Sequence, residues 1–163
     1  MNLTIRNMHK GETNDHAFTK DVFLCDFDGT ITEQDVCDEI MRGFSTTDWL
    51  AIGQLYDEGQ YTHKELTEAF VSSFKGSVDQ LRLFLERKIT IRSGFKEFLS
   101  TCEKHNIQPL IISSGWDLYI REILGNDFKL SFPRAVEDIF SATRDSLTVI
   151  CNHICTTNDH DWG

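Results

Sequence analysis

Two aspartates one residue apart, Asp26 and Asp28, end the apolar run "VFLCDF". A run of this kind predicts a short β-strand that is covered on both faces, as in a parallel sheet. Residues i and i+2 of a strand point to the same side, so the two carboxylates should converge while Phe27 points away. Two carboxylates this close repel each other unless a proton or a cation lies between them. Because Mg²⁺ prefers oxygen ligands and often combines one or two carboxylates with a substrate phosphate, the pair predicts a magnesium and phosphate site.

The two residues after the acids also suit a phosphate group. Gly29 permits a sharp turn, and we expect the turn to leave backbone N–H groups free to meet an anion. The carboxyl end of a parallel strand is the usual ligand site of α/β proteins. Asp-Gly is also a common turn signal without any function. The combination with Thr30 and with a second strand that ends in Ser-Ser-Gly favours the site over the plain turn.

The second strand is predicted at "PLIISSG", which ends with Ser113, Ser114 and Gly115. A helix is predicted before it, at residues 93–105, followed by a turn at Asn106. Another helix is predicted after it, at 116–124. We expect Ser114 and Gly115 to open that helix, where N–H groups and the helix dipole favour an anion. Apolar runs that alternate with amphipathic helices are typical of an α/β fold with a parallel sheet.

A helical segment is predicted between the two strands, at residues 35–88. Two capping signatures place helix starts within it, Thr62 with Glu65 and Ser77 with Gln80. The segment should hold three or four helices inserted after the first strand. The domain organisation is therefore a flexible leader at 1–20, an α/β core at 21–34 and 89–163, and the helical insertion.

Two shorter runs with β character follow Pro133 in the sequence. They are "DIFSA" at residues 138–142 and "LTVICNHI" at 147–154. We expect both to belong to the α/β core.

The motif Asp-x-Asp-Gly-Thr, with the later "PLIISSG", resembles the haloacid dehalogenase-like (HAD) phosphatases. The resemblance implies a Rossmann-like parallel-sheet core and an α-helical cap like that of the phosphoserine-phosphatase-like branch. It implies that Asp26 attacks phosphorus to form an aspartyl phosphate and that Asp28 acts as general acid/base. It also implies Mg²⁺ as cofactor, held by Asp26 and Asp28, and phosphate binding by Ser113.

Two finer features follow from the same resemblance. Asp35 matches a cap-side position that contacts substrate in this branch, although it could equally be a helix N-terminal residue favoured by the dipole. The sequences "CNH" near residue 151 and "DW" near 161 look similar to enzymes that dephosphorylate an enol phosphate. The implied partner is a small phosphorylated metabolite, either phosphoserine-like or enol-phosphate-like.

The sequence departs from the family pattern after Ser113. The family has a lysine and then a Gly-Asp strand with a further acid, whereas "NDHDW" at 158–162 lacks the lysine and the glycine. Losing such charge-stabilising groups typically lowers the rate by about 10² to 10³ each. The alternative function is therefore an inactive phosphate-binding or scaffold protein.

The same departure leaves a sheet edge open. In the family fold the absent strand lies beside the first one, and an unpaired apolar edge invites association. A longer gene product, a second chain in a homo-oligomer, or residues 138–155 could cover this edge.

Composition excludes several other functions. The 163-residue chain has a net charge of −10, which excludes nucleic acid as the main partner because no basic stripe replaces phosphate counterions. No apolar stretch is long enough to cross a membrane, and the polar start lacks a signal peptide, which predicts a cytoplasmic protein.

The five cysteines predict no disulfide framework in a reducing compartment. Cys25 and Cys102 are expected in the core. Cys151, His153 and Cys155 alternate along one strand, with His160 nearby, so a soft-metal site is an alternative to ordinary core or edge residues. Their spacing matches no familiar zinc motif, which favours the ordinary reading. Trp116, directly after Gly115, is expected to pack beside the phosphate-binding turn, where it could also touch a substrate.

Overall fold

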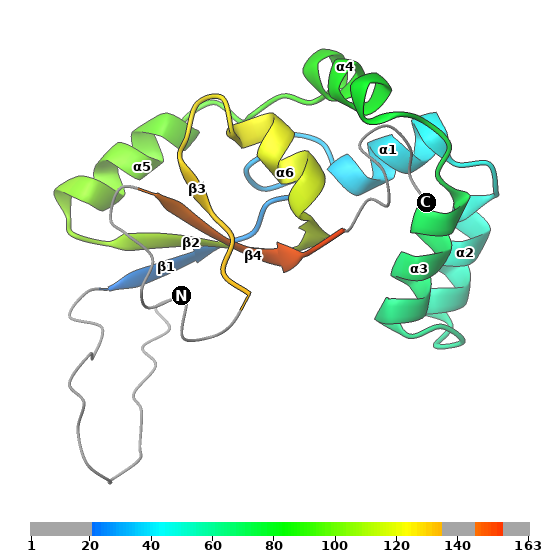
Figure 1. Cartoon of the computed structure of the whole chain (residues 1–163). Coiled ribbons are helices and arrows are strands. Elements are labelled where there is room, and N and C mark those ends of the chain that lie inside the picture. The colour runs from blue at the N-terminus through cyan, green and yellow to red at the C-terminus, as the bar shows by residue number, and fades with distance from the viewer. Residues whose placement is uncertain (1–20, 135–145, 155–163) are drawn as a thin grey trace, which may run out of the picture.

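The computed structural model describes residues 21–134 and 146–154 of the chain. Its centre is a four-stranded sheet in the order β1-β2-β4-β3, with every neighbouring pair parallel (Figure 1). The strands are β1 (Val22–Cys25), β2 (Gln108–Trp116), β3 (Leu130–Ser131) and β4 (Leu147–Asn152). The predicted α/β class, Rossmann-like core and parallel sheet are confirmed.

Two helices flank β2 in the sequence. They are α5 (Phe95–Lys104) and α6 (Asp117–Leu124). The predicted helix at 93–105 is confirmed, and the turn after it lies at Asn106, whose φ of 57° is left-handed. Asparagine adopts this conformation more readily than most residues.

The prediction that Ser114 and Gly115 open the next helix is wrong. β2 continues to Trp116, which pairs with Asn152 of β4, and α6 begins only at Asp117. The backbone of Trp116 is extended, with φ −111° and ψ 137°. The pairing with β4 keeps this segment from coiling into the helix.

Four helices lie between β1 and α5. They are α1 (Val36–Phe44), α2 (Trp49–Asp57), α3 (His63–Ser73) and α4 (Val78–Lys88). Both predicted capping boxes form, Thr62 with Glu65 at α3 and Ser77 with Gln80 at α4. Figure 1 shows α2 and α3 together, away from the sheet. The division of the chain into a core and a cap stays a prediction.

The chain leaves and re-enters the sheet region at one place. Thr32 and Ile91 form an antiparallel bridge, and the N–H of Glu33 donates to the carbonyl of Thr90 at 2.9 Å. On the other side of the bridge, the N–H of Arg92 donates to the carbonyl of Ile31 at 2.8 Å. The inserted helices are therefore tied together at their base, next to the turn that follows β1.

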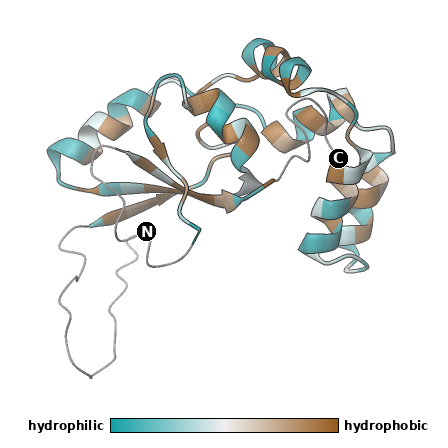
Figure 2. Ribbon diagram, in the orientation of Figure 1, coloured by the Kyte–Doolittle hydropathy of each residue, from teal (hydrophilic) through white to brown (hydrophobic). Residues whose placement is uncertain are grey.

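One hydrophobic cluster joins the sheet to the helices. Its fully buried members include Phe27 after β1, Ile40 of α1, Ile120 of α6 and Val149 of β4. Figure 2 shows apolar residues concentrated along the strands, with many polar residues on α5. No helix within 21–134 and 146–154 has the length and apolar character needed to cross a membrane.

The prediction that β1 is covered on both faces is wrong for the described part of the chain. Adjacent residues Phe23 and Leu24 are 47% and 46% exposed, and β1 lies at the edge of the sheet. Residues 147–152 pair with β2 on its other side, so this part of 138–155 does not cover the β1 edge. The predicted run at 138–142 and the leader at 1–20 lie outside the described residues.

Candidate active site

The aspartates lie in the turn beyond the carboxyl end of β1. The carbonyl of Phe27 accepts the N–H groups of Thr30 and Ile31, at 3.2 and 2.9 Å, which closes the turn. Phe27 is completely buried, as expected for a side chain that points away from the acids. Asp26 is exposed, and its Oδ2 accepts the Thr30 hydroxyl at 3.0 Å.

Asp28 is held by three different elements. Its Oδ2 accepts the Tyr119 hydroxyl at 2.7 Å and the Ser113 hydroxyl at 3.3 Å. Its Oδ1 accepts the N–H of Val36, the first residue of α1, at 3.0 Å. The carboxyl of Asp28 therefore joins the turn after β1 to α6, to β2 and to the first inserted helix. The two acids have different protein partners.

Burial raises the pKa of Asp28 above its usual range, although the hydrogen bonds from Tyr119, Val36 and Ser113 act in the opposite direction. Burial also raises the pKa of Tyr119, and the neighbouring negative charge of Asp28 raises it further. Tyr119 therefore stays protonated and donates. A carboxyl group whose pKa is raised toward neutrality is suited to proton transfer.

Gly29 is positioned as a turn residue, with φ of 68°. Its N–H donates to the carbonyl of Gln34 at 2.9 Å and approaches the Thr32 hydroxyl at 3.2 Å. The expectation that this N–H is free for an anion is therefore wrong for this conformation, since the loop itself uses the donor. Thr30 directs its hydroxyl to Asp26.

The end of β2 approaches Asp28 closely at Gly115. The Gly115 N–H donates to the Ser113 hydroxyl at 2.9 Å. A Cβ at this position would meet the Tyr119 hydroxyl and lie 2.8 Å from Asp28 Oδ2. The structure thus brings Ser113 and Gly115 to Asp28, and only glycine leaves room for them. Ser114 is exposed, and its carbonyl accepts the Asn152 amide.

Two residues of the site were missed by the sequence analysis. Arg92 donates from Nη2 to the Gly29 carbonyl at 3.0 Å and from Nε to the Thr30 carbonyl at 3.1 Å. Tyr119 is completely buried against Asp28. Each of the two side chains bonds to a residue more than sixty positions away in the sequence, so no local pattern identifies it.

Asp35 is the N-cap of α1. Its Oδ1 accepts the N–H of Asp38 at 2.9 Å, and the residue is exposed. This is one of the two alternatives given above for Asp35, the helix N-terminal residue; the other is a contact with substrate. Its contact with substrate stays a prediction.

The histidine and cysteine alternation does not form a metal site in the described ranges, where no three His, Cys, Asp or Glu side chains are grouped around a common point. His153 Nδ1 lies 3.0 Å from Asp117 Oδ2 instead. Burial, followed by the charge of Asp117, raises the pKa of the Cys151 thiol to about 12. Cys155 and His160 lie outside the described residues.

The other cysteines and Trp116 are mostly packing residues. Cys102 is buried, as expected, but Cys25 is only half-buried, and neither forms a disulfide. Trp116 is 4% exposed, with its ring centroid 6.1 Å from that of Tyr119. This burial favours packing over contact with a substrate.

The donor set near the acids fits a hard cation. The exposed carboxylate of Asp26 and the neighbouring backbone carbonyls provide oxygen atoms only, which is the ligand type of Mg²⁺. The described residues form no closed cage of acids. An ion bound here would keep coordination positions for water and phosphate.

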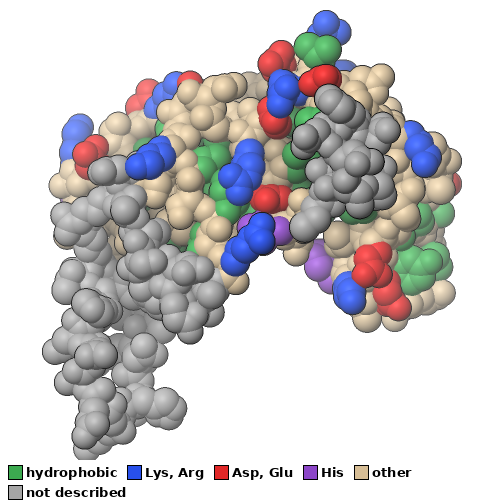
Figure 3. Space-filling view, viewed as in Figure 1, with side chains coloured by type: hydrophobic (Ala, Val, Ile, Leu, Met, Phe, Trp, Pro, Cys, Tyr) green, Lys and Arg blue, Asp and Glu red, His purple; other side chains and the backbone are tan. Residues whose placement is uncertain are grey.

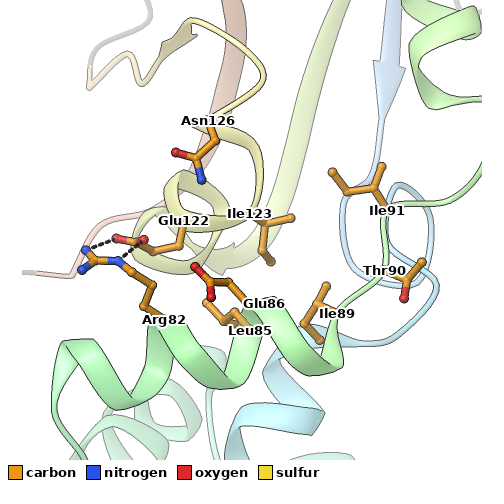
Figure 4. A pocket seen from close by; sticks show the side chains of 9 residues that line it. All are labelled: Arg82, Leu85, Glu86, Ile89, Thr90, Ile91, Glu122, Ile123 and Asn126. Carbon is orange, nitrogen blue, oxygen red and sulfur yellow. Dashed lines mark hydrogen bonds and ion pairs between the residues drawn. The ribbon is translucent and has the colours of Figure 1, made fainter.

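A separate pocket of about 370 Å³ lies between α4 and α6 (Figure 4). Its apolar lining includes Leu85, Ile89 and Ile123, and the ion pair between Arg82 and Glu122 lies at its edge. None of the predicted site residues lines this pocket. It is distinct from the acidic turn.

The chain can be aligned with curated relatives over about half of each relative's length. The chain is 36% identical over 107 residues to a 2-hydroxy-3-keto-5-methylthiopentenyl-1-phosphate phosphatase from Brevibacillus brevis, covering 63% of this chain and 47% of the relative. It is 31% identical over 102 residues to the protein of the same name from an Exiguobacterium species, covering 62% and 47%. The chain thus spans about half the length of these relatives.

Solved structures share the fold at lower identity. A HAD family hydrolase from Salmonella enterica serovar Typhi has a TM-score of 0.63 at 19% identity, covering 85% of this chain and 43% of that one. A phosphoserine phosphatase structure has a TM-score of 0.59 at 20% identity, covering 88% and 61%. The family model of the haloacid dehalogenase-like hydrolases matches residues 23–152. The chain therefore belongs to the haloacid dehalogenase-like hydrolase family.

Proposed function

We propose that this chain supplies the nucleophile and the proton-transfer residue of a Mg²⁺-dependent phosphomonoester hydrolase. The observation that carries the proposal is the contrast between neighbouring acids. Asp26 is exposed at the end of β1, whereas Asp28 is held by Tyr119 at 2.7 Å with its pKa raised by burial. Two acids in different environments can serve as nucleophile and as proton donor.

Asp26 would attack phosphorus and form an aspartyl phosphate, which splits one displacement into two. Asp28 would protonate the leaving oxygen and then take a proton from the attacking water. Mg²⁺, held by the Asp26 carboxylate and the Asp28 backbone carbonyl, would neutralise charge on the transferring group.

The phosphate group would lie between the turn after β1 and the end of β2. Ser113 donates to Asp28 at 3.3 Å, a long contact that a phosphate oxygen could replace. The N–H groups of Gly29 and Gly115 are hydrogen-bonded within the chain, so they would have to exchange partners to bind phosphate. Thr30 and Ser114, which are both exposed, complete the proposed set of phosphate-binding residues.

The proposed substrate is a small phosphorylated metabolite of the enol-phosphate type. This rests on the relatives, whose names specify a 2-hydroxy-3-keto-5-methylthiopentenyl-1-phosphate phosphatase. The fold is shared with phosphoserine phosphatase, so an amino-acid phosphate is the second class to test. Asp35, at the start of α1, would approach the part of the substrate beyond the phosphate.

The test is Mg²⁺-dependent phosphate release from a panel of enol, amino-acid, sugar and choline-type phosphates. We expect release by the wild type, loss of it in Asp26→Asn, and retention in Asp57→Asn, an exposed acid at the end of α2. Equal release by Asp26→Asn would refute the nucleophile.

A binding protein without catalysis is the second candidate. It is favoured by the departure from the family pattern, since "NDHDW" at 158–162 lacks the lysine and the glycine that the family has. Phosphate binding by the wild type without turnover of any substrate in the panel would support this alternative.

We also propose that the β1 edge pairs with a second chain. Phe23 and Leu24 are about half exposed there, and an open apolar edge favours strand addition. A wild-type dimer that Phe23→Lys converts to monomer in light scattering is the expected result. A monomeric wild type at every concentration would exclude the dimer.

A further inference from the structure

We infer that residues 152–154, the last residue of β4 and the two that follow it, form a brace that positions the irregular end of β2. The brace consists of Asn152, His153 and Ile154. The irregular end of β2, Ser113 to Trp116, is called the loop below. His153 is then a positioning residue that acts through Asp117. That this loop is positioned to bind phosphate rests on the proposed function.

The β2–β4 ladder is interrupted at this loop. Pairing runs regularly to Ile112 and Ile150, and the next pair is Trp116 with Asn152. Between these two pairs, the three residues 113–115 of β2 face the single residue Cys151 of β4. An irregularity of this kind leaves backbone groups without their ladder partners, and other contacts must hold the loop in place.

The brace supplies these contacts from three consecutive residues. Asn152 Nδ2 donates to the Ser114 carbonyl at 2.5 Å. His153 Nδ1 lies 3.0 Å from Asp117 Oδ2, and the N–H of Ile154 donates to Asp117 Oδ1 at 3.1 Å. Ser114 lies within the loop and Asp117 directly follows it, so the brace holds both.

The charges around His153 support a fixed arrangement. The side chain of Asp117 is only 12% exposed and that of His153 is 25% exposed. Arg121 Nε lies 3.7 Å from Asp117 Oδ2, and its guanidinium stacks 3.7 Å above the Phe132 ring. Figure 3 shows histidine, acidic and basic side chains gathered near the middle of one face. A carboxylate approached from three sides is unable to turn away easily.

The loop in turn sets the geometry next to Asp28. Ser113 accepts the N–H of Gly115 at 2.9 Å and donates to Asp28 at 3.3 Å. Small displacements of groups that hold a reacting phosphate lower the rate or affinity strongly. Loss of the brace should therefore weaken phosphate binding, although no hydrogen bond described here joins the brace to Asp26 or Asp28.

The first experiment measures amide hydrogen exchange of Gly115 and Trp116 in the chain without ligand. In His153→Leu we expect exchange on the order of ten-fold faster, the size expected from one lost hydrogen bond to a charged group. His153→Asn places an amide nitrogen where Nδ1 lies and should restore wild-type exchange. His153→Gln, whose amide mimics Nε2 instead, should resemble the leucine variant. His105→Leu, at the exposed end of α5, is the matched control.

The second experiment measures the affinity for inorganic phosphate in the presence of Mg²⁺. It should fall roughly ten-fold in His153→Leu and His153→Gln and recover in His153→Asn. Unchanged exchange in all variants would overturn the brace. Faster exchange with unchanged phosphate affinity would overturn its positioning role. The variants could show the expected exchange changes while the wild type binds no phosphate. That result would confirm the brace as a contact and would count against the proposed function instead.

Discussion

The helices inserted after β1 fall into an inner pair and an outer pair. The inner helices α1 and α4 bury apolar side chains in the common core: Val36, Ile40 and Met41 from α1, and Leu81 and Leu85 from α4. The outer helix α2 has no buried residue, and α3 buries only Ser73. The buried core of the described residues therefore includes side chains from two of the four inserted helices.

The inner helices are also tied to the site and to α6. The first N–H of α1, from Val36, donates to Asp28. Arg82 of α4 binds Glu122 of α6 through two contacts, at 2.7 and 3.0 Å. We infer that α1 and α4 help to position Asp28, whereas no hydrogen bond described for α2 or α3 reaches this residue.

The largest expected effect comes from a core residue of the inner pair. Ile40→Ala, at a completely buried position, should lower the free energy of unfolding by about 2 to 5 kcal/mol because it leaves a cavity. Leu50→Ala on α2, where the side chain is 60% exposed, should change it by about 0.5 kcal/mol or less. Urea denaturation measures both. Equal losses would show that the outer pair is as much a part of the core as the inner pair.

A smaller effect is expected from two glycines. Gly115→Ala would place a methyl group against Tyr119 and Asp28 and should cost about 1 to 3 kcal/mol of stability through overpacking. Gly53→Ala in α2 meets no atom within 4 Å and should stabilise the helix by about 0.5 to 1 kcal/mol. Thermal unfolding compares the two variants. A stabilising Gly115→Ala would contradict the close approach at the site.

The third effect depends on pH. The folded-state pKa of Asp28 is raised above about 3.8, so the native chain binds this proton more tightly than the unfolded chain does. The stability of the wild type should therefore fall relative to Asp28→Asn as pH rises from about 4 through the raised pKa. Denaturant unfolding at several pH values, without metal, measures the difference, and Asp57→Asn gives the background. A wild type that gains stability relative to Asp28→Asn over this range would show that the pKa is lowered instead.

Local patterns predicted the elements well and the site only in part. The capping boxes at Thr62 and Ser77 formed because their contacts lie within four residues of sequence. The extent of β2 was mispredicted because pairing of Trp116 with Asn152 keeps the strand extended past Gly115. Such a pairing depends on a distant segment, which no local pattern contains.

The contacts of Asp28 show the same limit. The acid itself was found from its spacing to Asp26, but its donor Tyr119 lies on another helix, 91 positions away. The apolar run at β1 predicted a strand covered on both faces, because such a run has the same sequence at the edge of a sheet as in its centre. The open edge predicted from the departure from the family pattern agrees better with the half-exposed Phe23 and Leu24. Neighbours in space, rather than residue type, decide these features.

The measurement that tests the central claim most directly is fluorine NMR of the chain with Mg²⁺ and beryllofluoride, which mimics a phosphoryl group on a carboxylate. We predict a bound signal in the wild type, its absence in Asp26→Asn, and its presence in Asp57→Asn. The signal requires no turnover, so it examines Asp26 independently of the rest of the reaction. A bound signal that persists unchanged in Asp26→Asn, or no bound signal in the wild type, would contradict Asp26 as the phosphoryl acceptor.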